Sequence, residues 1–256
     1  MPMLYEGRQH KRVARESLDC ALALQELETM GVDNIITFDA HDPRVQNAIP
    51  LTGFENVHAT YQMIKACLRY DDKIILNKDN TMIISPDEGA VGRCIYYSSV
   101  LGMDLGMFYK RRDYATVVDG KNPIVAHEFL GSDLAGKDVI VVDDMIASGD
   151  SMIDVAKELK KRKARRVLVF STFGLFTEGV DKFNQAYESG LIDAVFTTNL
   201  VYRMPELLRA PWYHEVDMSK YIALIIKTLN DDNSISELLT PISRIEKILN
   251  KYRGQA

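Results

Sequence analysis

Short apolar runs recur along the chain, and each is followed by a polar loop and then by a segment with helical spacing. Four of these runs are almost continuously apolar, at residues 34–38, 81–85, 139–142 and 167–172. Such runs are typical of strands that are covered on both faces. Strands that alternate with amphipathic helices predict an α/β fold with mainly parallel sheets.

Four segments carry the helical signal. Leucines recur at helical spacing within residues 15–30, and residues 151–163 begin at a hydroxyl group and end in basic residues. We expect these two helices to flank a sheet. Near the C-terminus, residues 220–229 predict a helix, and another is expected from Pro241, because proline is tolerated in a first helical turn.

A polar and charged stretch, residues 71–80, separates two groups of strands and helices and predicts a connection between domains. The expected N-terminal domain covers residues 1–72 and the expected C-terminal domain residues 81–216. Residues 217–256 are expected to pack on the first domain. Residues 1–70 supply only about two strands and two helices, too little for a two-sided α/β layer, so we expect the first domain to be incomplete.

Composition narrows the functional classes. The net charge is −5 without a basic block, which gives no electrostatic reason to expect nucleic-acid binding. The longest apolar runs are far below the roughly 20 residues that cross a bilayer, and the N-terminus lacks an apolar signal core. We expect a cytoplasmic protein that binds neither nucleic acid nor membrane. Cys20, Cys67 and Cys94 form no Cys-x-x-Cys pair and predict buried, reduced thiols.

Residues 139–151, Val-Ile-Val-Val-Asp-Asp-Met-Ile-Ala-Ser-Gly-Asp-Ser, join a predicted strand to a predicted helix. A turn of this kind points backbone N–H groups and the helix dipole at an anion. The acids at the strand end, Asp143 and Asp144, would then meet the hydroxyl groups of a sugar or a metal. The alternative is an acidic strand end followed by a capped helix without a ligand.

This segment resembles the loop that binds phosphoribosyl pyrophosphate (PRPP) in phosphoribosyltransferases and PRPP synthetases, where Asp-Asp is followed by three variable residues and Thr-Gly-Gly-Thr. Ser148, Gly149 and Ser151 fit that pattern. Asp150 stands where a second glycine is usual, and Ala147 where an acid is common. A carboxylate at Asp150 would oppose a bound phosphate unless its side chain points away or a cation intervenes. The resemblance implies a ribose 5-phosphate site made of Asp143, Asp144, Ala147, Ser148, Gly149, Asp150 and Ser151.

Four other segments occur in the order and spacing that PRPP synthetases show. They are Gly-Arg-Gln-His-Lys-Arg at 7–12, Phe-Asp-Ala-His-Asp-Pro-Arg-Val-Gln at 38–46, Ser-Pro-Asp-Glu-Gly at 85–89 and Tyr-Lys-Arg-Arg at 109–112. On these segments the chain is identified as a member of the ribose-phosphate diphosphokinase (PRPP synthetase) family. The resemblance implies two phosphoribosyltransferase-like domains in a homo-oligomer. It also implies transfer of a diphosphoryl group from Mg-ATP to ribose 5-phosphate, which gives PRPP and AMP for nucleotide biosynthesis.

The resemblance also implies roles for single residues on the nucleotide side. Arg8 and Gln9 match an arginine and a glutamine that contact ATP, and His41 and Asp87 match residues linked to Mg²⁺. Each residue also has an alternative role without a ligand. Arg8 and Gln9 would belong to a solvated basic patch, and His41 would be a structural histidine. Asp87 would be a turn residue whose carboxylate bonds to its own backbone.

Lys110 and Arg112 stand at alternate positions, so in an extended chain both side chains would leave on one face. That arrangement suits a cationic clamp, and the resemblance assigns the pair a catalytic role on a mobile segment, expected at residues 109–123, that closes over the reacting phosphates. The alternative is a solvated run of charges.

Family members carry a sizeable segment before the point where this chain begins. We therefore expect the ribose 5-phosphate half of the site to be retained and the chain to make little or no PRPP. Two other functions stay open from the sequence: a non-catalytic regulatory subunit that assembles with full-length synthetases, and a phosphoribosyltransferase that uses PRPP as donor. Formation of AMP from ATP and ribose 5-phosphate would distinguish the three.

Overall fold

Seven strands form the larger of two sheets in a computed structural model that describes residues 1–9, 15–71, 74–112 and 124–253. Their order across the sheet is β5-β4-β3-β6-β7-β8-β9. In that order the strands are β5 (Ile124–Leu130), β4 (Asp104–Arg112), β3 (Thr81–Ser85), β6 (Asp138–Ile146), β7 (Arg166–Gly174), β8 (Ala194–Thr198) and β9 (Tyr213–Val216). All neighbours are parallel except β4 and β5. The predicted α/β fold with mainly parallel strands is confirmed.

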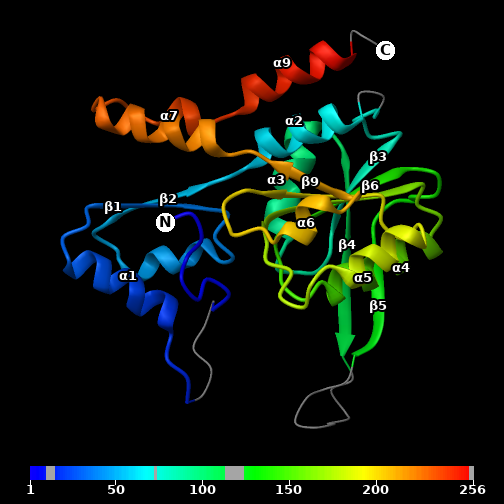
Figure 1. Ribbon diagram of the computed structural model, residues 1–256, viewed down its shortest axis with the longest axis horizontal. Coiled ribbons are helices and arrows are strands. Elements are labelled where there is room, and N and C mark those ends of the chain that lie inside the picture. The colour runs from blue at the N-terminus through cyan, green and yellow to red at the C-terminus, as the bar shows by residue number, and fades with distance from the viewer. Residues whose placement is uncertain (10–14, 72–73, 113–123, 254–256) are drawn as a thin grey trace.

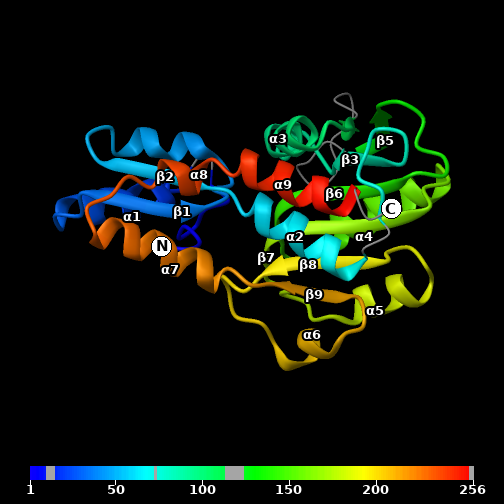
Figure 2. The ribbon, with the colours of Figure 1, turned by 90° about the horizontal axis from the view of Figure 1, so that it is seen from above.

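Helices cover both faces of this sheet (Figures 1 and 2). One face packs against α2 (Thr60–Tyr70) and α3 (Val91–Leu101), and the other against α4 (Asp150–Lys161), α5 (Asp181–Glu188) and α6 (Pro205–Arg209). Consecutive strand residues point to opposite faces. Because both faces are covered, the side chains on both sides of the central strands are mostly apolar, and these strands appear in the sequence as continuous apolar runs.

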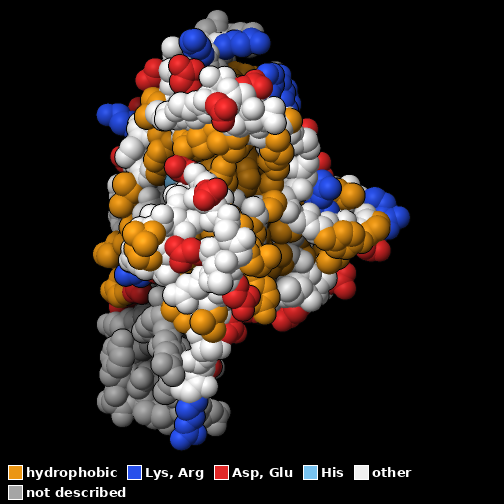
Figure 3. Space-filling model, turned by 90° about the vertical axis from the view of Figure 1, so that its left-hand side faces the viewer, with side chains coloured by type: hydrophobic (Ala, Val, Ile, Leu, Met, Phe, Trp, Pro, Cys, Tyr) orange, Lys and Arg blue, Asp and Glu red, His pale blue; other side chains and the backbone are white. Residues whose placement is uncertain are grey.

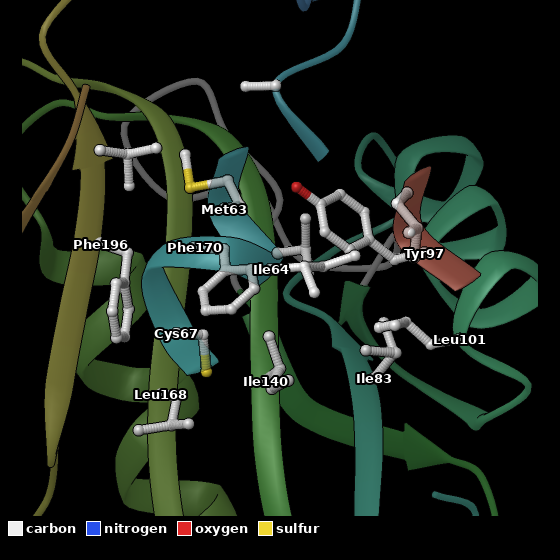
Figure 4. Close-up of a cluster of buried hydrophobic side chains, with 14 of the residues drawn as sticks. Met63, Ile64, Cys67, Ile83, Tyr97, Leu101, Ile140, Leu168, Phe170 and Phe196 are labelled. Carbon is white, nitrogen blue, oxygen red and sulfur yellow. The ribbon is translucent and has the colours of Figure 1, made fainter. Parts of the chain in front are cut away.

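The alternation is visible in β6, where Ile140 belongs to the hydrophobic cluster on the α2 and α3 face and Val141 to the cluster on the other face. Figure 4 shows the first of these clusters, in which Met63 and Ile64 of α2 lie over Ile140 and Phe170 of the sheet. Residues of this cluster are almost fully excluded from solvent, so the cluster fixes α2 on the sheet.

A second sheet holds only two parallel strands, β1 (Asn34–Phe38) and β2 (Gly53–Val57). It lies beside the larger sheet, together with α1 (Asp19–Thr29) and the 3₁₀ helix η1 (Pro43–Ala48) (Figure 1). A small hydrophobic cluster of its own, which includes Leu24 of α1 and Ile35 of β1, holds these elements together.

The last three helices return across both parts of the molecule (Figure 2). Tyr221 of α7 (Ser219–Asn230) meets Phe38 of β1 edge to face at 6.2 Å. After the short helix α8 (Ser236–Leu239), α9 (Ile242–Arg253) packs on α2 through buried Ile245 and Leu249. Residues 217–253 therefore contact both the small sheet and a helix of the larger one.

The predicted elements agree with the structure within a few residues. The helix expected at residues 15–30 begins only at Asp19, and the strand that starts at Asp104 continues to Arg112, so the start of the expected mobile segment at Tyr109 lies inside β4. The rest of that segment, residues 113–123, lies outside the described residues. The three cysteines are buried and free, as predicted. Within the described residues no helix has both the length and the apolar character needed to cross a membrane.

One end of the molecule, shown in Figure 3, carries hydrophobic side chains on its surface. Large exposed hydrophobic side chains come from the elements around the small sheet, among them Leu22 of α1, Leu51 before β2 and Leu224 of α7. A sheet of two strands also presents backbone N–H and C=O groups along its edges. This end is therefore much less completely covered than the larger sheet.

Candidate active site

A cavity of about 330 Å³ opens where β3 and β6 end and where the loop after β1 approaches them. Ligands of open parallel sheets bind at this edge, outside the carboxyl ends of the strands. The cavity brings together nine residues that the sequence predicts as site residues: Arg8, His41, Asp87, Asp143, Asp144, Ala147, Ser148, Gly149 and Ser151.

The turn from β6 into α4 is shaped by Gly149, whose φ of 86° lies in the left-handed region. A Cβ atom at this position would lie far inside contact distance of the Phe183 ring. Glycine is therefore required twice, for the backbone angle and for the close approach of α5. Gly149 brings no side chain to cap the N-terminus of α4, although the N–H of Asp150 donates to Ser148 Oγ at 3.5 Å. The other N–H groups of the first turn have no partner within the helix, an arrangement typical of anion sites at helix starts.

Two adjacent carboxylates, Asp143 and Asp144, stand at the end of β6 beside the buried guanidinium of Arg93. Arg93 Nη1 lies 3.7 Å from Asp143 Oδ1 and 3.6 Å from Asp144 Oδ1. His41 Nδ1 lies 3.0 Å from Asp144 Oδ2. The backbone N–H of Asp144 donates to Asp143 Oδ1 at 2.8 Å. The two acids thus have different partners, although they are neighbours in sequence.

Their pKa values diverge for that reason. Burial, together with the adjacent charge of Asp144, raises the pKa of Asp143 to about 8. Burial also acts to raise the pKa of Asp144, but the hydrogen bond from His41 and the charge of Arg93 outweigh it and lower that pKa. Protonation is therefore favoured at Asp143 over Asp144 in the ligand-free site.

A second buried contact set ties the small sheet to the same place. Asp39, which follows β1 with a φ of 36°, lies with one oxygen 2.6 Å from His58 Nδ1 and accepts a hydrogen bond from Thr172 of β7 with the other. Arg93 also acts on Asp39 electrostatically: burial acts to raise the pKa of Asp39, and His58 and Arg93 together hold it below its usual value. The strained backbone of Asp39 thus places a carboxylate between the two sheets.

Asp150, predicted as part of the phosphate loop, does not line this cavity. Its carboxylate accepts hydrogen bonds from Lys182 Nζ at 2.6 Å and from Ser148 Oγ at 3.0 Å. Its side chain, 61% exposed, lines a different hollow between α4 and α5. The side chain of Asp150 therefore points away from the cavity, and a cation pairs with it. Either feature reduces the repulsion that its carboxylate would exert on a phosphate bound in the loop.

Gln9 also lies apart from the cavity, although Arg8 lines it. Its Oε1 accepts a hydrogen bond from the backbone N–H of Cys20 at 3.2 Å, near the start of α1. In this structure Gln9 therefore holds the chain that leads into α1. Lys110 and Arg112 occupy strand β4, where they pair with His127 and Ile124 of β5, and their side chains are outside the described part of the structure.

Asp87 begins a tight turn at the end of β3. Its Oδ1 accepts hydrogen bonds from the backbone N–H groups of Gly89 at 2.9 Å and Ala90 at 3.2 Å, which is the turn role named as its alternative. Asp87 nevertheless lines the cavity. Within the described residues, no three His, Cys, Asp or Glu side chains converge so that they could hold a metal by themselves.

The sequence patterns do not predict three polar residues that contact the acids at this place: Arg93, His58 and Thr172. A basic residue in the first turn of a helix that follows Ser-Pro-Asp-Glu-Gly is the one available signal for Arg93, since that helix starts at the same sheet edge as the acids. Nothing in the sequence marks His58 or Thr172, because their partner Asp39 is distant along the chain.

Known proteins resemble this chain over most of its length. Residues 53–177 match the family model of the phosphoribosyl transferase domain. The chain is 28% identical over 243 residues to a ribose-phosphate pyrophosphokinase of Shewanella oneidensis, and the match covers 94% of this chain and 72% of that protein. A ribose-phosphate pyrophosphokinase of Pasteurella multocida is 29% identical over 243 residues, with the same shares. The crystal structure of phosphoribosylpyrophosphate synthetase from Mycobacterium smegmatis aligns with a TM-score of 0.75 and 21% identity, over 91% of this chain and 70% of that chain, and so shares its fold.

Proposed function

This chain belongs to the ribose-phosphate pyrophosphokinase (PRPP synthetase) family, and on that premise we propose that it transfers the diphosphoryl group of ATP to the C1 hydroxyl of ribose 5-phosphate. The observation that carries the proposal is the shared cavity. Three features meet in one place: the helix start at Gly149, the two carboxylates at the end of β6, and Arg8 with His41 from the other part of the chain. A phosphoribosyl ligand and a nucleotide need those two halves side by side.

On the sugar side, the loop from Asp143 to Ser151 binds ribose 5-phosphate. The backbone N–H groups at the start of α4 hold the 5-phosphate, where the helix dipole favours an anion. Asp143 and Asp144 hold the hydroxyl groups of the ribose. A protonated carboxyl group is able to donate a hydrogen bond and an ionised one to accept, so the unequal pKa values of the pair suit a ligand that carries several hydroxyls.

In the reaction, the C1 hydroxyl oxygen of ribose 5-phosphate loses its proton and bonds to the β-phosphorus of ATP. The bond from that phosphorus to the oxygen bridging to the α-phosphorus breaks, and AMP leaves. Chemistry of this kind depends on positioning and on neutralising charge at the phosphates. Arg8 and Gln9 serve ATP in this proposal, although Gln9 would have to release the N–H of Cys20 to do so.

Magnesium fits the residues at the nucleotide side of the cavity. Mg²⁺ takes oxygen ligands and is usually bound through one or two carboxylates, several waters and the phosphates of the substrate. Asp87 supplies a carboxylate in the same cavity as His41, whose imidazole would contact the ion through water. When bound, the ion would neutralise charge on the transferring phosphates.

Lys110 and Arg112 are proposed as the cationic pair that stabilises those phosphates in the transition state. Their support is their alternate positions along β4, whose register with β5 shifts between Arg111 and Arg112. A homo-oligomer in the cytoplasm is part of the same proposal. The hydrophobic surface around the small sheet supports the assembly.

The test is formation of AMP and PRPP from ATP, Mg²⁺ and ribose 5-phosphate by the purified chain. AMP is expected to appear only when ribose 5-phosphate is present, in equal amount to PRPP, which distinguishes the reaction from simple ATP hydrolysis. Calorimetric titrations of ribose 5-phosphate and of Mg-ATP onto the same folded sample measure the two half-sites separately. A folded protein that binds neither ligand and forms neither product would refute the proposal.

A further inference from the structure

The first turn of α5 packs directly against the phosphate loop. The ring of Phe183 occupies the space that a side chain at Gly149 would need. Its neighbour Lys182 donates from Nζ to Asp150 Oδ1 at 2.6 Å and to Glu178 Oε2 at 2.5 Å. Two consecutive residues of α5 thus touch two consecutive residues of the loop.

Asp150 is the unusual member of this contact. It is the first residue of α4, and its neighbours Gly149 and Ser151 both line the cavity proposed for the phosphate. A carboxylate at this position and a phosphate dianion bound in the loop would repel each other. The side chain instead lines the hollow between α4 and α5, which also contains Lys157 and Lys182.

Lys182 is the strongest partner that keeps Asp150 in that orientation. The hydrogen bond from Lys182 is the main reason why the pKa of Asp150 lies below its ordinary value, ahead of the bond from Ser148. Glu178, four residues before Lys182 and ahead of α5, shares the amine with Asp150. The cation therefore offsets part of the charge of Asp150 beside the loop and restrains its side chain.

We propose that Lys182 is a positioning residue for ribose 5-phosphate: it holds the Asp150 carboxylate outside the cavity and partly offsets its charge, without touching the ligand. This inference rests on the proposed function, because it concerns the 5-phosphate of that substrate. It explains how a loop with a carboxylate at this position retains an anion site.

A double-mutant cycle tests the proposal, with Lys182→Met, Asp150→Asn and the double variant. Lys182→Met is expected to raise both the dissociation constant and the KM for ribose 5-phosphate about three- to fivefold, as for loss of one exposed charge pair near the ligand, with kcat and the KM for ATP kept. In the Asp150→Asn background, the same change is expected to have an effect of less than about twofold. Lys161→Met, which removes a lysine paired with Glu158 at the far end of α4, is the matched control and should leave ribose 5-phosphate binding unchanged.

The outcomes separate the two proposals. If Lys182→Met raises the dissociation constant for ribose 5-phosphate equally in both backgrounds, Lys182 binds the phosphate itself. If it raises the constant in neither background, Lys182 has no role. Both results overturn the positioning role while wild-type binding of ribose 5-phosphate persists. A folded wild-type protein that does not bind ribose 5-phosphate would overturn the proposed function, and this inference with it. The pKa of the Asp150 carboxyl group, measured by carbon NMR without ligand, gives an independent test. This pKa should rise in Lys182→Met and stay unchanged in Lys161→Met.

Discussion

His41 Nδ1 lies 3.0 Å from Asp144 Oδ2, so the loop after β1 and the end of β6 share a polar contact at the cavity. These residues are 103 positions apart in the chain. The contact raises the pKa of His41, chiefly through its hydrogen bond to Asp144. It directly joins the expected nucleotide side and the expected sugar side of the site.

The pKa of His41 provides the first prediction. In ligand-free, metal-free protein, NMR titration is expected to give a value above 6.5 for wild type and a lower value in Asp144→Asn. Because the folded-state pKa is raised, the contact stabilises the protein fully below pH 6.5, and the contribution is lost as pH rises through the folded value. The difference in unfolding free energy between wild type and His41→Gln should therefore shrink with rising pH. A difference that grows with pH would contradict the pairing.

Arg93 carries the second prediction, because its side chain is only 10% exposed and faces three acids, Asp39, Asp143 and Asp144. Arg93→Met is expected to cost about 2–4 kcal/mol in urea unfolding, since removing one partner leaves buried carboxylates without compensation. Arg93→Lys should recover part of that loss. Arg69→Met, on the exposed side of α2, is the control and should change stability by less than about 0.5 kcal/mol. Equal stability of the Arg93 and Arg69 variants would show that the buried cation is dispensable.

Prediction from sequence succeeds where local pattern and burial act together. The run at residues 81–85 coincides with β3, all of whose residues are buried, so nothing competes with the apolar signal. The loop at Gly149 is equally local, because its strand, turn and helix start are consecutive. The lining of one cavity by Ser148, Gly149 and Ser151 could therefore be expected from the sequence, while their role in binding a phosphate stays a prediction.

The remaining contacts depend on residues that fold together from distant positions. Asp39 and Thr172 are 133 positions apart, and no pattern around either residue indicates the other. The orientation of Asp150 depends on Lys182, which belongs to a helix that was not predicted. From the sequence we could name two ways in which the Asp150 carboxylate would not repel a bound phosphate: a side chain that points away, or a nearby cation. The packing of α5 is needed to see that the side chain points away and that Lys182 pairs with it.

Asp138 provides a prediction about stability at the opposite edge of the sheet. Its side chain is fully buried and accepts hydrogen bonds from Arg165 Nε at 2.7 Å and Arg166 Nη2 at 2.5 Å. Burial acts to raise its pKa, but the two arginines outweigh burial and lower it. A lowered pKa means that the contribution is present above pH 3.8 and is lost as pH falls through the folded value. Asp138→Asn is expected to lose about 2 kcal/mol at pH 7.

The control for Asp138 is Asp154→Asn, which removes an exposed pair with Lys157 on the surface of α4 and should change stability by less than about 0.5 kcal/mol. Chemical denaturation at pH 7 and at pH 3 measures both. A stability gap between Asp138→Asn and wild type that is the same at the two pH values would rule out the ionised pair.

Lys110 is expected to act mainly in the transition state. Lys110→Ala should lower kcat about 10²-fold or more, with the dissociation constants of both substrates nearly unchanged, as for removal of one charge-stabilising donor. The matched control is Lys137→Ala, because Lys137 lies near the start of β6 and donates to the backbone of Lys78, away from the cavity. A rise in KM at constant kcat would show that Lys110 binds substrate and transition state equally.

Gly149 permits the sharpest test of the phosphate loop, because two separate demands meet at one residue. Its φ of 86° disfavours any side chain, and the Phe183 ring fills the space that a Cβ would occupy. Gly149→Ala is therefore expected to lose about 1–3 kcal/mol of unfolding free energy and to weaken binding of ribose 5-phosphate at least tenfold. Phe183→Leu in the Gly149→Ala background removes the steric conflict but not the backbone strain. The double variant should thus recover stability in part while binding stays weak. Gly136→Ala, also at positive φ but with open space around it, isolates the cost of the backbone angle alone. If Gly149→Ala binds ribose 5-phosphate as well as Gly136→Ala does, the helix start at Gly149 is not the phosphate site.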